Sequence, residues 1–360
     1  MKLIYIIFFS LFVYPAFIFA QNESLDKLIK NIIKREVNFK ETPGISIGII
    51  DPDSTYTYSF GETRKGNDQT PDANTIYEIG SVTKVFTTAL LTIIEHKNVL
   101  SYGDTIGQYF SELKQPVTLL QLANHSSGFP KLPHNFGSKE QDANQPYINY
   151  TQEDLLSFLE KYVLTKPSGE KYTYSHTAYA LLTEIIEEAG GATFDELLQN
   201  YLFNHLKMND TRIILNDEQQ SRLAQGNSQG GEVPAWEYRS FEGALGLKST
   251  VNDLLKFLSM HLGDHHKILD ETLRKNFERH HESNFRSDTY SGLGWHVQSP
   301  RRRVPDVYIH VGATHGCYAF VALAPHSHTA VVVLSNSKKS TSSVGQMIFD
   351  TINFNWRRRS

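Results

Sequence analysis

Residues 77–94 read YEIGSVTKVFTTALLTII, and this stretch decides both the fold class and the chemistry that we expect. Its apolar residues recur at spacings of three and four, the pattern of a helix buried along one face. They are Val82, Val85, Phe86, Ala89, Leu90, Ile93 and Ile94. The pattern predicts a helix that begins at or near Ser81. Ser81 and Lys84 then stand at i and i+3 on one face of that helix, with Ser81 at the positive end of the helix dipole.

Strand-like segments lie toward both ends of the chain, on either side of this helix. Residues 44–50 and 54–60 are joined by Asp51-Pro52-Asp53, whose residue types favour a turn, so they predict a hairpin. Thr250 and Asp253 are spaced as in a capping box that opens a helix. Later strands are expected at residues 308–311, 318–323 and 330–334, and helices at residues 251–262 and 343–353.

Apolar spacing between residues 100 and 235 is helical, and loops rich in Pro, Gly and Asn separate the helical segments. Strands at both ends of the chain with helices between them predict one α/β domain built from residues 21–99 and 236–360. Residues 100–235 would form a mainly helical domain inserted into it. Ligand sites favour such domain interfaces, so we expect the site there.

The composition is that of a globular chain: 40% of the 360 residues are hydrophobic. The formal net charge of −4 shows no basic excess, so nucleic acid is not expected as a partner. The single cysteine, Cys317, excludes an internal disulfide and is interpreted as a buried strand residue, with a reactive thiol as the alternative. The oligomeric state is left open.

The first twenty residues resemble a secretory signal peptide. Lys2 is followed by an apolar run from Leu3 to Phe19 and the small residue Ala20, and polar residues begin at Gln21. We therefore expect a protein exported to a periplasm or to the medium. An uncleaved anchor is the alternative, because the run approaches the roughly 20 residues that span a bilayer. No later stretch is apolar enough to span a membrane, so no stable span is expected after cleavage.

The Ser81-Val82-Thr83-Lys84 motif can carry nucleophilic catalysis. A serine is a weak nucleophile until a base takes its proton, and a lysine can act as that base where its surroundings favour the neutral amine. The spacing alone is weak evidence, since Ser-x-x-Lys also occurs at Ser24, Ser111, Ser168 and Ser335. Ser81 differs from these because it opens a buried helix directly after Gly80, which permits close backbone approach.

Tyr174-Ser175-His176 precedes a helical pattern over residues 178–189. A tyrosine hydroxyl held near a lysine can have its pKa lowered and can act as general base and general acid. Aromatic packing is the alternative interpretation of Tyr174.

His310-Val311-Gly312-Ala313 ends a predicted strand. Such an edge could offer backbone N–H groups to an oxyanion, and His310 could bind or polarise a substrate. An ordinary strand followed by a glycine turn is the alternative.

Taken in order, Ser81-Val82-Thr83-Lys84, Tyr174-Ser175-His176 and His310-Val311-Gly312 resemble the three motifs of class C β-lactamases and their relatives among D-alanyl-D-alanine peptidases and esterases. The family pattern is Ser-x-x-Lys, Tyr-x-Asn and Lys/His-x-Gly. The resemblance covers approximately residues 40–340, and the connecting segments 119–128, 246–254 and 312–316 share it.

The resemblance implies an antiparallel sheet flanked by helices, with a helical domain inserted. It makes Ser81 the nucleophile and gives the base and acid roles to Lys84 and Tyr174. The backbone N–H groups of Ser81 and Ala313 would form the oxyanion hole. The implied reaction forms an acyl-Ser81 intermediate that water hydrolyses. The remaining implied site residues, which would bind substrate, are His176, His310 and Gly312.

Two positions depart from the family pattern. His176 stands where Asn is usual, which puts substrate positioning in doubt. His310 stands where strong β-lactamases of this class have Lys, and a neutral imidazole attracts a carboxylate less than an ammonium does. We therefore rank a peptide containing D-residues, or a small ester or amide, above a β-lactam as the substrate.

Two rival functions remain. The fifteen histidines could suggest a metal site, but no ligand spacing such as His-Glu-x-x-His accompanies them, so neither a metal nor another cofactor is expected. The second rival is a catalytically inactive module that senses cell-wall fragments or β-lactams. His176 supports it, whereas intact Ser81, Lys84 and Tyr174 argue against it.

Overall fold

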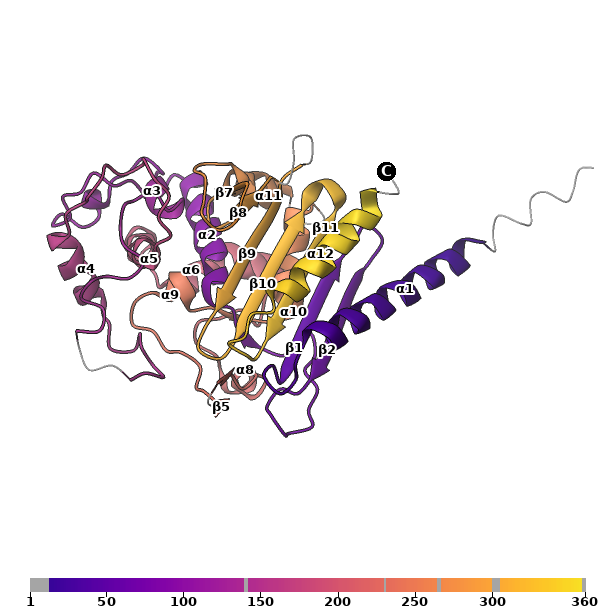
Figure 1. The fold of residues 1–360 in the computed structure, drawn as a ribbon. Helices are drawn as coiled ribbons and strands as arrows, with labels where there is room; N and C mark the ends of the chain where they lie inside the picture. Colours follow the sequence, from indigo (N-terminus) through magenta and orange to yellow (C-terminus); the bar gives the residue numbers. More distant parts are fainter. Residues whose placement is uncertain (1–12, 139–141, 230, 264–266, 300–304, 358–360) are drawn as a thin grey trace, which may run out of the picture.

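The computed structural model describes residues 13–138, 142–229, 231–263, 267–299 and 305–357. Its centre is a seven-stranded sheet with the order β2-β1-β11-β10-β9-β8-β7, in which all neighbours are antiparallel. The strands are β1 (Gly44–Ile50), β2 (Thr55–Gly61), β7 (Thr289–Ser291), β8 (His296–Gln298), β9 (Val307–Ala313), β10 (Tyr318–Ala324) and β11 (Thr329–Ser335). The predicted antiparallel sheet is confirmed, and the first strand pairs with the last (Figure 1).

Burial explains the strand sequences. β1 reads GISIGII and is buried at every position, because it lies between two strands and under helices on both faces. β2, at the sheet edge, reads TYTYSFG and is only partly covered, so polar and aromatic residues alternate there. β7 and β8 were not expected from the sequence, since each has only three residues and no clear alternation.

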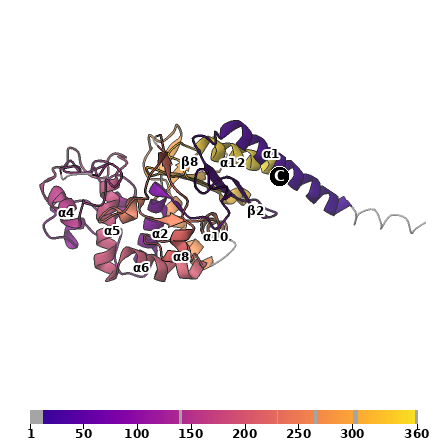
Figure 2. The ribbon, with the colours of Figure 1, turned by 90° about the horizontal axis from the view of Figure 1, so that it is seen from below.

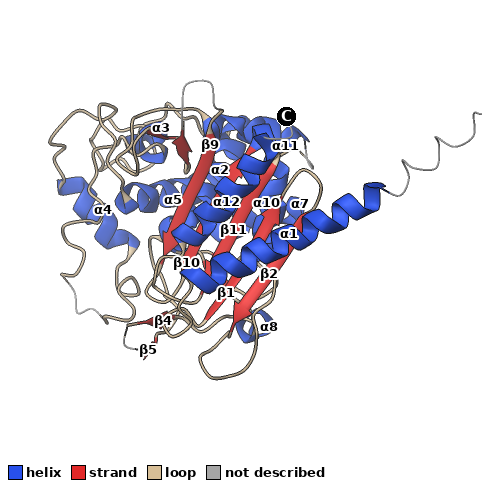
Figure 3. Cartoon of the chain, turned by 45° about the vertical axis from the view of Figure 1, so that its right-hand side comes forward, coloured by secondary structure: helices blue, strands red, loops and turns tan. Residues whose placement is uncertain are grey.

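Helices cover both faces of the sheet. α1 (Val13–Glu36) and α12 (Ser342–Arg357) lie on one face, where they share an apolar cluster with the sheet (Figures 2 and 3). The helices on the other face are α2 (Thr83–His96), α10 (Val251–His261) and α11 (Lys267–Leu273). The Thr250 hydroxyl accepts the Asp253 N–H, which confirms the expected start of α10.

A largely helical region lies beside the sheet. Its α-helices are α3 (Leu119–Ala123), α4 (Gln152–Lys161), α5 (His176–Gly190), α6 (Phe194–Leu198), α7 (Asn204–Leu206), α8 (Asp217–Ser221) and α9 (Glu242–Leu245). Short helical turns occur at several places along the chain, both inside and outside this region: η1 (Gly80–Val82), η2 (Ile106–Gln108), η3 (Gln199–Phe203), η4 (Arg274–Phe277) and η5 (Pro325–Ser327). Two small ladders pair β3 (Tyr77–Glu78) with β6 (Lys248–Ser249) and β4 (Asn227–Ser228) with β5 (Gly231–Glu232).

The predicted signal segment lies partly outside the described residues, which begin at Val13. From there α1 runs without a break to Glu36, across the expected cleavage point near Gln21. None of the helices in the described ranges combines the length and apolarity needed to cross a membrane.

Candidate active site

Ser81 stands on a sharp turn between β3 and α2. Gly80 has a φ of +48°, a conformation that a residue with a Cβ rarely adopts. The turn is the 3-10 helix η1, and the α-helix proper begins at Thr83, so the predicted start at or near Ser81 is confirmed. Ser81 remains partly exposed, whereas Lys84 is completely buried. The nucleophile candidate therefore faces solvent and its lysine partner faces the interior.

Lys84 is held as a buried amine that forms no ion pair with any residue the structure describes. Its Nζ lies 3.4 Å from the Ser81 Oγ and donates to the Ala244 carbonyl oxygen of α9 at 2.7 Å. The nitrogen also lies 5.1 Å from the centre of the Tyr174 ring and 5.4 Å from that of the Tyr179 ring. Burial, with a smaller contribution from Lys131, holds the Lys84 pKa well below its ordinary value. The neutral amine, which can accept a proton, is thus favoured.

Tyr174 reaches Ser81 from the loop that precedes α5. Its hydroxyl lies close enough to the Ser81 side chain for Ser81 to influence its pKa, and its ring packs on His125 at a centroid distance of 4.5 Å. Burial raises the pKa of Tyr174 above its ordinary value. The expectation that a nearby lysine lowers this pKa was therefore wrong, because burial is the largest influence on the phenol and raises its pKa. Tyr174 is a neutral phenol in this site.

His125 positions the Tyr174 loop and was not found from the sequence. Its backbone takes a φ of +64°, its carbonyl accepts the Thr173 N–H at 2.6 Å, and its Nδ1 accepts the Ser175 N–H at 3.1 Å. An Nδ1 that accepts carries no proton, and burial lowers the His125 pKa well below its ordinary value. His125 therefore fixes the backbone on both sides of Tyr174 as a neutral ring.

Strand β9 approaches the Ser81 turn so closely that both segments need glycine. A Cβ on Gly80 would lie 2.8 Å from the Ala313 nitrogen, and a Cβ on Gly312 would overlap the Ile79 carbonyl oxygen. The Thr314 N–H bonds to Cys317 across the β9–β10 turn. Along an antiparallel strand the N–H groups point alternately toward one neighbouring strand and away from it, so the Ala313 N–H points away from β10. On that other side of β9 the pairing with β8 ends at Ile309, before it reaches Ala313. The Ala313 N–H is thus directed toward the Ser81 turn.

His310 is buried on β9, with 2% of its surface exposed. Its Nδ1 lies 2.9 Å from the Val311 carbonyl oxygen, and its ring stacks on His296 of β8 at 5.2 Å. His296 in turn stacks on Phe285 at 4.0 Å, with an angle of 5° between the planes. Burial lowers the pKa of His296 to about 3. The sequence did not identify His296, because β8 is too short to show a strand pattern.

His176 is the first residue of α5 and lies beneath the loop that contains Lys131, whose carbonyl accepts the His176 N–H at 2.9 Å. Its Nδ1 is buried and has no hydrogen-bond partner in the segments that the structure describes. Burial, followed by the charges of Lys84 and Lys131, holds the pKa of His176 well below its ordinary value. The structure therefore brings His176 to the site as a neutral ring with an unsatisfied nitrogen.

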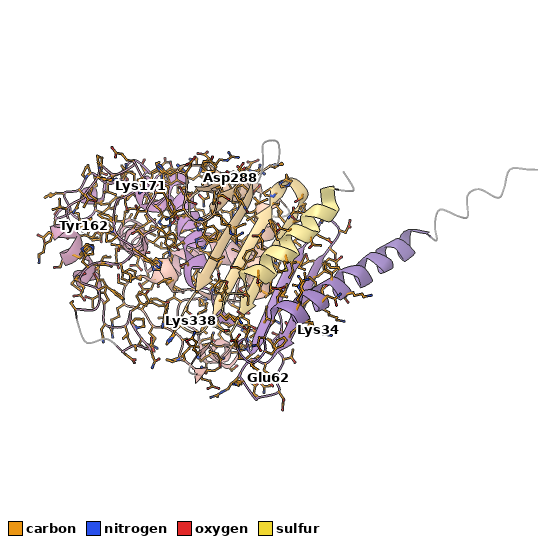
Figure 4. All side chains as sticks on the ribbon, viewed as in Figure 1. Lys34, Glu62, Tyr162, Lys171, Asp288 and Lys338 are labelled. Atoms are coloured by element: carbon orange, nitrogen blue, oxygen red, sulfur yellow. The ribbon has the colours of Figure 1, made fainter. Side chains whose placement is uncertain are left out.

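The site lies where the helical region meets the sheet. Figure 4 labels Lys171, in the loop leading to Tyr174, and Asp288, directly before β7, both toward the upper edge of the view. The rings of Tyr174 and His296 lie 6.4 Å apart, centroid to centroid. Across the described ranges, no group of three or more His, Cys, Asp or Glu side chains is arranged to hold a metal ion. Cys317 is buried, as expected, but it lies in the β9–β10 turn directly before β10 and not in a strand.

The fold thus places a partly exposed serine, Ser81, beside a fully buried lysine, Lys84, where the helical region meets the sheet. The family model described as Beta-lactamase matches residues 29–349. The chain therefore belongs to the β-lactamase family, and it is a serine hydrolase of that family.

Named relatives and solved structures agree with this assignment. The D-alanyl-D-alanine-carboxypeptidase/endopeptidase AmpH of Escherichia coli K12 is 24% identical over 82% of this chain and 80% of its own length. A β-lactamase of Lysobacter lactamgenus is 25% identical over 82% of this chain and 83% of its own length. The crystal structure of a class C β-lactamase in complex with cefoxitin is similar with a TM-score of 0.81 and 19% identity, covering 92% of this chain and 99% of that one.

Proposed function

We propose that the chain hydrolyses an amide or ester through an acyl-Ser81 intermediate, acting on a peptide that contains D-residues or on a small ester, with at most weak activity on β-lactams. The observation that carries this proposal is the Lys84 amine, which is fully buried, has no counterion within the described part of the chain and lies 3.4 Å from the Ser81 Oγ. A neutral amine at that distance is a general base positioned for the serine proton.

The hydrogen bonds of Lys84 define its role. A neutral amine has two N–H groups and one lone pair. One N–H donates to the Ala244 carbonyl, which orients the nitrogen and leaves the lone pair for the Ser81 proton. Ser81 Oγ then attacks the substrate carbonyl. The developing oxyanion accepts hydrogen bonds from the N–H groups of Ser81 and Ala313, which the Gly80–Ala313 approach brings together.

Tyr174 completes the proton path as a neutral phenol. Its hydroxyl, which interacts with the Ser81 side chain, donates a proton to the leaving group. The Lys84 ammonium formed in the first step then returns a proton to the Tyr174 hydroxyl. Water then attacks the acyl-Ser81 ester with the same groups in reverse. His176, His310 and Gly312 line the substrate side, with Gly312 acting through its lack of a side chain. No metal or other cofactor takes part.

The proposal includes export and a two-part architecture. Residues 1–20 would direct export, and the substrate would enter between a sheet domain of residues 21–99 and 236–360 and a helical domain of residues 100–235. Edman sequencing of the protein recovered from the medium or periplasm tests cleavage near Gln21. Recovery of an intact amino terminus from membranes would contradict it.

A non-catalytic binding module is the second candidate, favoured by one observation. Among the described residues, the buried Nδ1 of His176 has no hydrogen-bond partner, and the ring stands near Lys84 where the family pattern has an amide side chain. Such a protein would be acylated at Ser81 and would release the acyl group slowly or not at all.

Intact-mass detection of a fluorophosphonate adduct tests the proposed nucleophile. We expect a single adduct on the wild type, none on Ser81→Ala and strongly slowed labelling of Tyr174→Phe. Labelling of the Ser81→Ala variant would contradict the assignment of Ser81 as the nucleophile. Burst kinetics with a chromogenic ester separate the two candidates: repeated turnover supports the hydrolase, and a burst that stops at one equivalent supports the binding module.

A further inference from the structure

Glu78 is a buried carboxylate three residues before Ser81 that takes no part in the proposed proton path. It ends strand β3, and each of its oxygens accepts one hydrogen bond. Oε1 accepts the Trp236 N–H at 2.8 Å, and Oε2 accepts the Thr314 hydroxyl at 2.9 Å. These partners lie 158 and 236 residues further along the chain. The carboxylate therefore joins three segments that meet only in the folded protein.

Thr314 transmits this contact to the end of strand β9. Its hydroxyl oxygen accepts the Cys317 N–H at 3.2 Å and the Gly316 N–H at 3.4 Å, so it closes the β9–β10 turn from within. A hydroxyl has one proton and two lone pairs, and the bond to Glu78 uses the proton. Thr314 directly follows Ala313, whose N–H is directed toward η1. The bond to Glu78 thus fixes the residue next to this N–H.

Among the described strands, the end of β9 is paired on one side only. Strand β10 pairs with it as far as Ala313, whereas the pairing with β8 stops at Ile309. The unpaired side approaches η1, the turn that contains Ser81. The bond from Thr314 to Glu78 supplies a further restraint, because β3 runs into η1.

The contact requires a carboxylate. The Trp236 N–H and the Thr314 hydroxyl both donate, and a glutamine amide has one oxygen to offer them. Its N–H groups would face either a donor or a hydroxyl whose lone pairs already accept backbone N–H groups. Burial raises the pKa of Glu78, and the Trp236 N–H, the charge of Lys248 and the Thr314 hydroxyl oppose that rise.

We propose that Glu78 is a positioning residue for the reaction: through Thr314 it holds the Ala313 N–H in its direction toward the Ser81 turn. Glu78 itself does not touch the substrate. An oxyanion forms only as the serine attacks, so a loosened Ala313 N–H lowers the rate of acylation more than the affinity for the substrate. This inference rests on the proposed acyl-Ser81 chemistry and adds to it a residue outside the reacting groups.

Two substitutions of Thr314 test the proposal. Thr314→Val keeps the shape of the side chain and removes the hydroxyl, whereas Thr314→Ser keeps the hydroxyl. Fluorophosphonate labelling over a range of probe concentrations separates the rate constant of Ser81 modification from the dissociation constant of the probe. We expect Thr314→Val to lower the rate constant at least about tenfold and to change the dissociation constant less than about threefold. Thr314→Ser should restore the wild-type rate constant.

Thr211→Val is the matched control. Thr211 is also buried, and its hydroxyl donates to the Asp253 carboxylate at 3.0 Å, which ties it to α10 rather than to β9. Its loss should lower Tm about as much as Thr314→Val does and leave labelling unchanged. Glu78→Gln should slow labelling as Thr314→Val does. The double variant should be no slower than the slower single one, because both changes remove the same contact.

The inference is overturned if Thr314→Val is labelled at the wild-type rate, if Thr314→Ser is slowed as much as Thr314→Val, or if the losses multiply in the double variant. Equal slowing of Thr211→Val would assign the effect to lost stability and would overturn it too. The Thr314 variants decide the matter if Glu78→Gln does not fold.

All these results leave Ser81 labelled in the wild type, whereas failure of the proposed hydrolase appears as a wild type that takes up no label. Amide hydrogen exchange over residues 312–317 then still tests the contact. Thr314→Val should exchange faster there than the wild type, and Thr211→Val should not. Equal exchange in all three proteins would show that Glu78 does not hold the end of β9.

Discussion

Gly312 lies so close to Ile79 that a methyl group added at its Cα would overlap the Ile79 carbonyl oxygen. This contact sets the spacing between strand β9 and the turn that carries Ser81. Because the proposed oxyanion hole takes one N–H from each segment, a single backbone contact controls its width.

Gly312→Ala is therefore expected to separate the two N–H groups and to lower the rate of Ser81 acylation about 10²–10³-fold, the usual effect of losing one oxyanion donor. The rate is measured by time-resolved fluorophosphonate labelling. Gly103→Ala is the control, since a Cβ there meets only the Ser101 hydroxyl at 3.9 Å. Equal labelling rates in the two variants would contradict the role given to β9.

Lys84→Met should separate catalysis from stability. The methionine side chain fills a volume similar to that of lysine. The substitution removes the buried amine, which has no counterion among the described residues, and it leaves the Ala244 carbonyl without its hydrogen-bond donor. We expect acylation to fall about 10²–10⁴-fold and the free energy of unfolding near neutral pH not to fall, because the variant no longer buries an amine whose protonated form the fold disfavours. Chemical denaturation and labelling give both values. A variant that unfolds would show that Lys84 is structural.

The pH dependence of stability should reveal that folding lowers the Lys84 pKa. The unfolded chain has an ordinary lysine pKa and the folded chain a lower one, so between the two values the unfolded state binds more protons. Stability from this residue thus rises with pH across that window and is lost as pH falls through the folded pKa. The free energy of unfolding of the wild type minus that of Lys84→Met should rise with pH. A flat difference would contradict a neutral Lys84.

Glu184 should change the free energy of unfolding with pH in the opposite direction to Lys84. Its carboxyl is buried, receives the Gln152 amide at 2.7 Å and has a pKa raised to about 8, mainly by burial. Between the ordinary pKa and this value the folded state binds more protons, so stability falls as pH rises. Glu184→Gln should flatten the decline between about pH 5 and about pH 8, measured by denaturation. Glu188→Gln, an exposed change on the same helix, should not.

His125→Phe is expected to leave the buried Ser175 N–H unpaired and to displace Tyr174, which costs about 1–3 kcal/mol of stability. His125→Asn should recover much of this, because Asn tolerates the positive φ and offers an acceptor. A positioning role predicts that kcat falls more than KM rises and that Asn restores kcat. If His125→Phe lowers the stability but leaves kcat unchanged, His125 only supports the fold.

Local sequence was sufficient where neighbours along the chain determine the structure. The hairpin of residues 44–60, the helix after Ser81 and the cap at Thr250 were predicted because turn chemistry and apolar spacing act over a few residues. The strands β7 and β8 were missed because three residues are too few for a period. With them His296 was missed, and His125 gave no signal because its acceptor role depends on a residue 50 positions later.

The sequence by itself determined which reactive groups the chain has and that Ser81 and Lys84 share one helix face, since covalent spacing and helical geometry place them there. Only the tertiary structure decided their protonation. Burial against Ala244, 160 residues away, holds the Lys84 pKa well below its ordinary value, and the His310 Nδ1 is committed to a strand carbonyl. Desolvation and hydrogen-bond direction come from segments that meet only on folding, and they decide what the same residues can do.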